Sequence, residues 1–132
     1  MDVGTRLSFV NLLKSKSDAL TISKALISAL EVDRETTLKC LRTDGGGEYV
    51  SAAWQNFSQE KGFLHELTAP CSPRANGMSE RLNRTLLEKV RCLLIWSELP
   101  KSYWDVALLH SNWLRNRQPT SALQGGIPVE AS

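Results

Sequence analysis

Short apolar runs alternate along this chain with segments of helical periodicity, and this alternation constrains the fold more than any other feature. Residues 7–13 have the sequence LSFVNLL, which is typical of a buried strand. Residues 17–32 carry apolar side chains at helical spacing, so we expect a helix there. Residues 36–44 alternate apolar and polar side chains before a run of three glycines, which predicts a strand that ends in a tight turn.

The same order of elements continues in the middle of the chain. Residues 49–61 predict an amphipathic helix, and Gly62 stands where a left-handed cap would end it. Residues 63–67 predict a further short strand. Residues 68–77 bring together two prolines, an Asn-Gly pair and small polar residues, a composition typical of a loop.

Two helices are expected in the last part of the chain. Apolar residues three or four apart predict a long helix from Met78 to near Trp96, and a final helix is expected over about 101–116. A strand followed by a helix, three times over, indicates an α/β fold in which helices pack against a sheet. We expect the final helix to bury a stripe made of Trp104, Leu108, Leu109 and Trp113.

The length of 132 residues suits one domain, which we assign to residues 1–118, followed by a loop-rich tail over 119–132. Apolar runs are shorter than the roughly 18 residues that a membrane span needs, so no membrane partner is expected. The odd number of cysteines, three, supports neither a zinc site nor a disulfide framework. Together with the absence of a secretory signal pattern, this indicates an intracellular protein.

Two carboxylates are the candidates for chemistry. Asp44 is expected at the end of a strand, beside glycines that let a ligand approach the backbone closely, which is typical of α/β active sites. Glu80 is expected near the start of the long helix. Each also has a structural explanation, because Asp is an ordinary turn residue and a carboxylate is favoured at the positive end of a helix.

Two sequence blocks carry a family resemblance. The block LRTDGGGEY, followed by TAPCSPRANGMSERLNRTLLEKVRCLL, resembles the catalytic core of retroviral-type integrases, in particular those of copia-type long terminal repeat retrotransposons. PKSYWDVALLHSNWLRNRQPTSAL and KSKSDAL are similar to flanking segments of the same family, so the resemblance covers nearly the whole chain.

The resemblance implies a ribonuclease-H-like fold, a mixed sheet flanked by helices, in which carboxylates hold two Mg²⁺ or Mn²⁺ ions. In that family the ions serve 3′-processing and strand transfer of DNA, the reactions of DNA integration. Asp44 matches the second catalytic carboxylate and metal ligand, and Glu80 matches the third. Paired divalent ions of this kind activate an attacking oxygen and stabilise a leaving one, and they favour carboxylate oxygens.

The resemblance also implies DNA as the partner, both the element's ends and the target, with a homodimer and a nuclear location expected. Residues 68–77 would form a mobile loop beside the DNA, with Asn76 at its end. Arginines on the following helix could meet DNA phosphates, although a solvated helix face explains such residues as well. The candidate DNA-binding residues are Asn76, Arg81, Arg84 and Arg91.

The chain departs from the family pattern at its start. The first catalytic Asp of the family stands on an initial hairpin, and Asp2 matches the stretch just after that hairpin. We therefore expect a fragment that lacks the first β-hairpin, with an incomplete two-ion site and no catalysis as it stands. The alternative is a non-catalytic remnant that acts as a DNA-binding or self-association module, the latter through the helix with Trp104 and Trp113.

Overall fold

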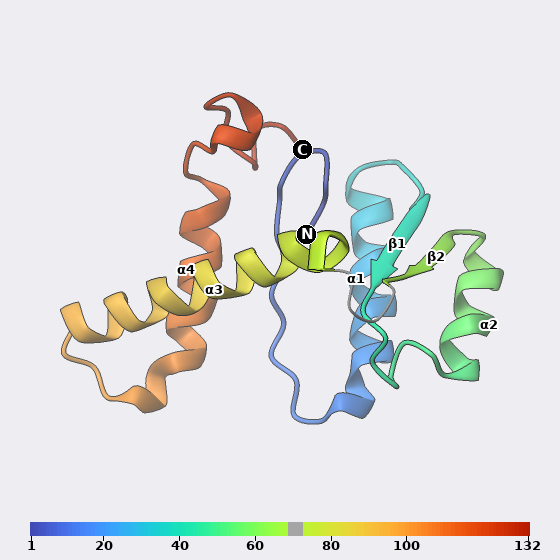
Figure 1. The fold of residues 1–132 in the computed structure, drawn as a ribbon, viewed down its shortest axis with the longest axis horizontal. Helices are drawn as coiled ribbons and strands as arrows, with labels where there is room; N and C mark the ends of the chain where they lie inside the picture. The colour runs from blue at the N-terminus through green and yellow to red at the C-terminus, as the bar shows by residue number, and fades with distance from the viewer. Residues whose placement is uncertain (69–72) are drawn as a thin grey trace. The chain divides into compact units, whose positions relative to one another are not determined.

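The computed structural model describes residues 1–68 and 73–132, with the side chains of 73–76 left out. The chain divides into two compact units, which we consider separately. The sheet unit comprises residues 13–77, and the terminal unit comprises residues 1–12 together with 78–132. The helices and strands, drawn in Figure 1, are α1 (Ala19–Asp33), β1 (Cys40–Thr43), α2 (Ala52–Lys61), β2 (Leu64–Leu67), α3 (Pro73–Trp96) and α4 (Trp104–Asn116). Short 3₁₀ turns cover Lys16–Asp18, Lys101–Tyr103 and Ser121–Leu123.

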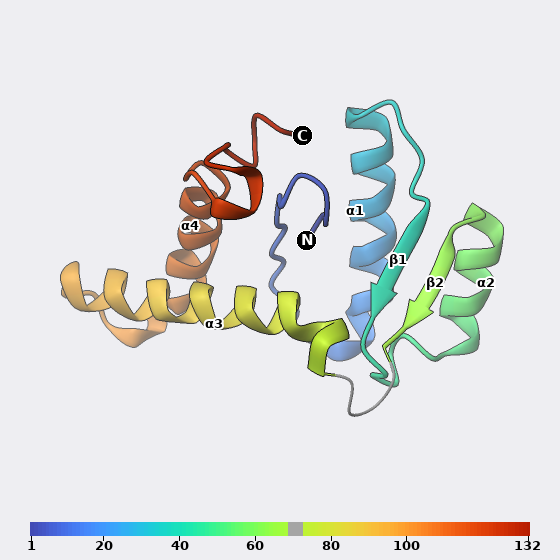
Figure 2. The ribbon, with the colours of Figure 1, turned by 45° about the horizontal axis from the view of Figure 1, so that its top comes forward.

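The sheet unit is an α/β unit, as predicted. Within the described residues, β1 and β2 form a two-stranded parallel sheet in which Cys40 pairs with Leu64 and Thr43 with Leu67. Helix α1 runs beside β1, and α2 runs beside β2 (Figures 1 and 2). The apolar core between them contains Ile27, Phe57 and Phe63, with Leu20, Leu38 and Leu41 packed against it.

Local signals set the bounds of α2, which begins three residues later than the predicted helix 49–61 and ends at Lys61 as predicted. The Ser51 hydroxyl accepts a hydrogen bond from the Trp54 backbone N–H at 3.3 Å, which caps the start of the helix. Gly62 ends it in the left-handed conformation, with φ of 75°, a region that glycine enters without a steric penalty. The predicted cap at Gly62 is therefore confirmed.

The strand predicted at residues 7–13 is not formed. The Asn116 side chain accepts a hydrogen bond from the Ser8 backbone N–H at 3.0 Å. The Asn112 and Asn116 side-chain amides donate to the Ser8 carbonyl at 3.0 and 2.8 Å. Because side chains of α4 satisfy the backbone groups that a strand would pair with a neighbour, Leu7 and Ser8 are buried without belonging to a sheet.

The buried stripe predicted for α4 is wrong as well. Trp104, Leu109 and Trp113 are 52%, 46% and 50% exposed, and Leu108 is half-buried. The helix instead buries the small and polar side chains of Ala107, Ser111 and Asn116. Since the asparagines of α4 hold the backbone at Ser8, this polar side faces inward, and Trp113 lies nearly opposite the buried Ser111.

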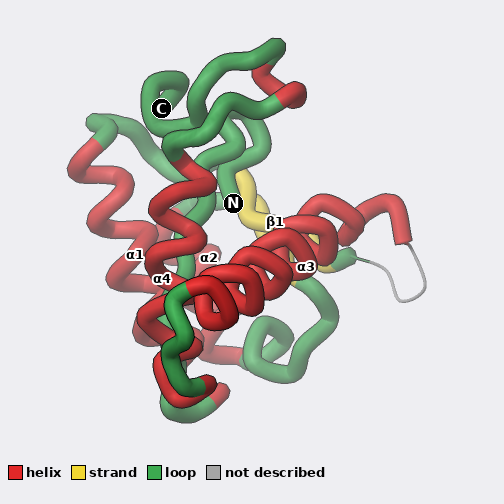
Figure 3. The backbone as a smooth tube through the Cα atoms, turned by 90° about the vertical axis from the view of Figure 1, so that its left-hand side faces the viewer, coloured by secondary structure: helices red, strands yellow, loops and turns green. Residues whose placement is uncertain are grey.

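Helix α3 begins earlier than its periodicity indicated, at Pro73 in place of Met78. Residues 73–77 of the expected mobile loop are therefore helical, whereas 69–72 lie outside the described residues. Proline suits a helix start because its fixed φ matches the first helical turn. Helices α3 and α4 cross in the terminal unit, with loops joining and following them (Figures 1 and 3).

Residues after 118 belong to the terminal unit and pack against its end of α4, because the Val129 backbone N–H donates to the Asn116 carbonyl and Pro128 is buried. The boundary that we placed between residues 118 and 119 stays a prediction. In the described part of the chain, every helix is too short or too polar to cross a membrane.

Candidate functional site

Asp44 directly follows the last residue of β1, and its side chain is exposed. One of its carboxylate oxygens, Oδ1, accepts a long hydrogen bond of 3.3 Å from the Gly46 backbone N–H. A methyl group added at Gly46 would lie 3.1 Å from Asp44 Oδ1 and 3.1 Å from Glu48 Oε1. Because Gly46 has no side chain, the carboxylates of Asp44 and Glu48 can both lie close to this turn. Glu48 is not among the site residues predicted from the sequence.

Side chains of the sheet unit hold the segment on either side of Asp44. Thr43 Oγ1 and His65 Nε2 lie 2.8 Å apart and connect the two strands. The ring of Trp54, which is 1% exposed, packs between those of Tyr49 and His65, with centroid distances of 5.0 and 5.6 Å. Burial raises the pKa of Tyr49, and the negative charges of Asp44 and Glu48 raise it further. Asp44 thus follows a well-packed strand end.

Neither His65 nor Thr43 was selected from the sequence. One feature of the sequence points to these two residues. If the two predicted strands pair in parallel, the residues before Asp44 lie beside the strand of residues 63–67. The register of that pairing depends on contacts between residues distant in sequence, so periodicity alone could not reveal the Thr43–His65 contact.

Glu80 lies on α3, about two turns inside the helix, because α3 begins at Pro73. The expectation that Glu80 lies at the start of the helix, where a carboxylate is favoured, is therefore wrong. Its side chain is exposed to solvent. Arg84 lies one turn further along, on the same face of the helix. Arg81 and Arg91 are exposed on the same helix.

Asp44 belongs to the sheet unit and Glu80 to the terminal unit, so their joint metal site stays a prediction. Among the described residues, there is no cluster of three or more histidine, cysteine, aspartate or glutamate side chains that could hold a metal ion. Asn76 is part of α3, but its side chain is among those left undescribed, and its predicted contact with DNA stays a prediction.

Comparison with curated proteins finds similarity over nearly the whole chain. The retrovirus-related Pol polyprotein from transposon TNT 1-94 of Nicotiana tabacum is 38% identical over 128 residues, which are 97% of this chain and 10% of that protein. The corresponding polyprotein from transposon RE1 of Arabidopsis thaliana is 36% identical over 130 residues, 98% of this chain and 9% of that protein. The chain thus spans about a tenth of the length of these relatives. No family model matches it.

Solved structures show the same fold at low sequence identity. The HTLV-2 integrase catalytic core domain in complex with magnesium, in its trimeric form, aligns with a TM-score of 0.71 at 21% identity, over 98% of this chain and 79% of that one. A chain of the simian T-cell lymphotropic virus intasome, in complex with PP2A regulatory subunit B56 gamma, aligns with a TM-score of 0.60 at 23% identity, over 80% of this chain and 36% of that one. The predicted ribonuclease-H-like fold is confirmed by these alignments.

Proposed function

Because the chain is homologous to part of the retrovirus-related Pol polyproteins of copia-type transposons and has the fold of an integrase catalytic core, we propose that it is a piece of an integrase core built for metal-dependent DNA integration. The observation that carries this proposal is the position of Asp44. An exposed carboxylate at the end of a parallel strand, beside a glycine turn, stands where α/β folds place their ligand sites.

The donors fit a hard cation. Asp44 has one oxygen in a 3.3 Å hydrogen bond and no described ion pair, so its carboxylate remains available. Glu80 is likewise exposed, on a helix whose following turn carries Arg84. Asp44 and Glu80 would hold Mg²⁺ or Mn²⁺, which when bound would activate the attacking oxygen and stabilise the leaving one.

Neighbouring residues position the Asp44 carboxylate, and arginines on α3 are available for DNA. The Thr43–His65 contact fixes the end of β1, and Gly46 leaves the space in which Asp44 turns back toward Gly46 N–H. We propose that Arg84 and Arg91, on α3, donate to DNA phosphates, with Arg81 and Asn76 as further contacts. In the cell this activity would take place in the nucleus.

Divalent-ion binding tests the proposal. Titration with Mn²⁺ should show saturable binding that Asp44→Asn or Glu80→Gln weakens by about tenfold or more, the loss expected for a ligand to the ion. Asp33→Asn and Glu88→Gln are matched controls, because both carboxylates are exposed in the same units and neither belongs to the proposed site. Binding that survives both site substitutions unchanged would contradict the proposal.

A second candidate function, self-association without catalysis, is favoured by the outward face of α4. The rings of Trp113 and His110 stack at 6.0 Å with an angle of 8°, and the Arg117 guanidinium lies 4.2 Å from the centroid of the Trp113 ring. Leu109 is exposed one turn before Trp113, on the same face of the helix. Large apolar side chains gathered on an exposed helix are typical of protein interfaces. The solved integrase cores include forms described as trimeric and dimeric, which supports a second copy of the chain as the partner.

A further inference from the structure

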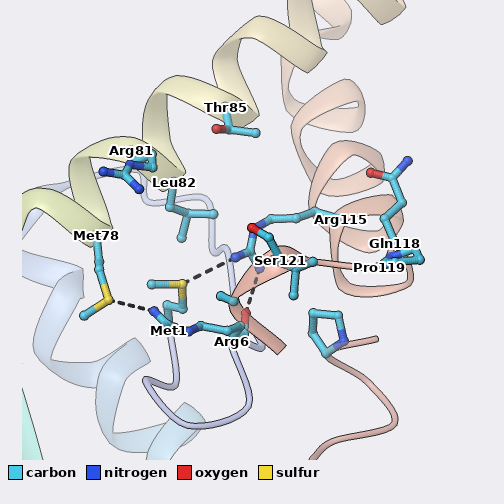
Figure 4. Close-up of a pocket in the computed structure, with 13 residues that line it drawn as sticks. Met1, Arg6, Met78, Arg81, Leu82, Thr85, Arg115, Gln118, Pro119 and Ser121 are labelled. Atoms are coloured by element: carbon cyan, nitrogen blue, oxygen red, sulfur yellow. Dashed lines mark hydrogen bonds between the residues drawn. The ribbon is translucent and has the colours of Figure 1, made fainter. Parts of the chain in front are cut away.

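Three arginines from three separate segments of the terminal unit line one cavity of about 300 Å³. Arg6 comes from the N-terminal segment, Arg81 from α3 and Arg115 from α4 (Figure 4). None of the described residues that line this cavity is acidic. Neutral hydrogen-bonding groups complete its polar lining, namely those of Thr85, Gln118, Thr120 and Ser121.

One guanidinium nitrogen of Arg6 and one of Arg115 donate to weak acceptors, whereas Arg115 Nη1 has oxygen acceptors at Arg6 and Ser8. Arg6 Nη1 donates to the thioether sulfur of Met78 at 2.8 Å, and Arg115 Nη2 donates to the sulfur of Met1 at 3.5 Å (Figure 4). A thioether sulfur is a weak acceptor. Arg6 Nε is buried without a hydrogen-bond partner among the described atoms. A buried donor left unpaired is costly, and a strong acceptor bound near Arg6 Nε would remove that cost.

Positive charge accumulates there. Burial lowers the pKa of Arg115, and the charge of the nearby Arg6 lowers it further. Arg115 Nη1 donates to the Arg6 carbonyl at 2.7 Å, so the two residues are held close despite this repulsion. Arg6 itself adopts a φ of 62°, a left-handed conformation that is strained for a non-glycine residue. The fold thus holds two like charges together where a bound anion would offset the repulsion.

We propose that this cavity binds a phosphate group, with Arg6 and Arg115 as its inner donors and Arg81 as the donor at the exposed rim. Phosphate fits because its several oxygens can accept from guanidinium groups that approach from different segments, and arginine binds it through paired donors. The phosphate would belong either to a nucleic-acid end or to a free phosphate compound. The proposal does not depend on the metal site at Asp44 and Glu80.

Calorimetric titration with inorganic phosphate, at an ionic strength held constant with chloride, tests the site. The chain should bind phosphate saturably, and Arg81→Gln should weaken binding by roughly tenfold, the loss expected for one charge-assisted hydrogen bond. Arg81 is exposed and makes no described hydrogen bond, so this variant should fold. Arg81→Lys, which keeps the charge, should weaken it less. Lys101→Gln removes an exposed charge outside the cavity and should leave binding unchanged.

Arg6→Gln provides a second variant, with circular dichroism to show that it remains folded, and it should also weaken phosphate binding. Arg115 is unsuitable because it also donates to the Ser8 hydroxyl at 3.0 Å and thereby holds the N-terminal segment. Absence of saturable phosphate binding, or binding by Arg81→Gln equal to that of Lys101→Gln, would overturn the proposal.

Competition then separates the two sources of phosphate. A short DNA strand with a 5′-phosphate and the same strand with a 5′-hydroxyl are each added to the phosphate-loaded chain. Displacement by the phosphorylated strand alone identifies a nucleic-acid end as the ligand. Phosphate binding that neither strand displaces identifies a free phosphate compound. Equal displacement by both strands would show backbone attraction in place of a site for a phosphate group, and would overturn the proposal.

Discussion

Thr43 Oγ1 and His65 Nε2 lie 2.8 Å apart, and this contact joins the end of β1 to β2 one residue before Asp44. One residue earlier, Arg42 also joins the strands, because its guanidinium donates to Glu66 Oε2 at 3.0 and 2.7 Å. A backbone hydrogen bond also restrains Thr43, because the Thr68 N–H donates to the Thr43 carbonyl at 3.0 Å. Thr43 therefore anchors the turn that presents Asp44.

Thr43→Val should lower the free energy of unfolding by about 1 kcal/mol, because it removes one side-chain hydrogen bond at nearly constant volume. It should also weaken Mn²⁺ binding by freeing the turn at Asp44. Chemical denaturation and Mn²⁺ titration measure the two effects. Thr37→Val, at an exposed loop position, is the matched control. Equal stability and equal Mn²⁺ affinity in the two variants would show that the Thr43–His65 contact restrains nothing.

Much of the sheet unit could be predicted from sequence, because its elements depend on local signals. The observed β1 lies within the predicted strand 36–44, and the observed β2 lies within the predicted strand 63–67. Helix α2 lies within the predicted helix 49–61 and ends before Gly62, as expected. The terminal unit was harder to predict, since its structure depends on contacts over more than 100 residues. Asn116 binds the backbone of Ser8, and no periodicity in either segment reveals that pairing.

In the candidate site too, local sequence signals predict one part and not the other. Asp44 could be placed at a strand end because glycines mark the turn, and the structure places it there. The start of α3 could not be placed, because Pro73 and Gly77 favour a loop when considered in isolation although both lie in the helix. Tertiary context also left Trp104 and Trp113 exposed, against the pattern that usually predicts a core face.

Acid should destabilise the sheet unit through Glu31. Its carboxylate accepts hydrogen bonds from Lys61 Nζ at 2.8 Å and from the Leu38 backbone N–H at 3.0 Å. The bond from Lys61 lowers the pKa of Glu31 most, and the bond from Leu38 lowers it further. A carboxyl with a lower pKa in the folded state contributes stability above its ordinary pKa of about 4.3 and loses it as the pH falls through the folded value.

Glu31→Gln should therefore flatten the dependence of unfolding free energy on pH below about 4.3, while lowering stability at neutral pH. Denaturation series at several pH values measure the slope. Glu60→Gln serves as the control, since Glu60 is exposed in the same unit. A slope in Glu31→Gln identical to that of the unmodified chain would exclude this ion pair as a source of acid sensitivity.

Asn116→Ala should destabilise the terminal unit by about 2 kcal/mol or more, because it leaves the buried backbone N–H of Ser8 unpaired. Asn83→Ala, at an exposed position of α3, should change stability by less than about 0.5 kcal/mol. Thermal unfolding of the two variants measures the difference. Similar melting temperatures would mean that Asn116 does not hold the N-terminal segment.

Self-association should depend on the outward face of α4. The double substitution of Leu109→Ala with Trp113→Ala, two exposed residues one turn apart on the same face, should weaken dimer formation by about tenfold or more, since large apolar anchors dominate interface energies. Sedimentation velocity over a range of concentrations measures it. Trp96→Ala, at the exposed end of α3, is the control. A chain that remains monomeric, or a control that weakens association equally, would exclude this face as the interface.

We propose that Asp44 and Glu80, which belong to different units, bind the same divalent ion. The most direct measurement is paramagnetic broadening of backbone amide NMR signals by substoichiometric Mn²⁺. We expect simultaneous broadening at Asp44 and its glycine turn and at Glu80 on α3, abolished at both places by either Asp44→Asn or Glu80→Gln. Broadening at one of the two places only, or at both but lost independently in the two variants, would contradict it.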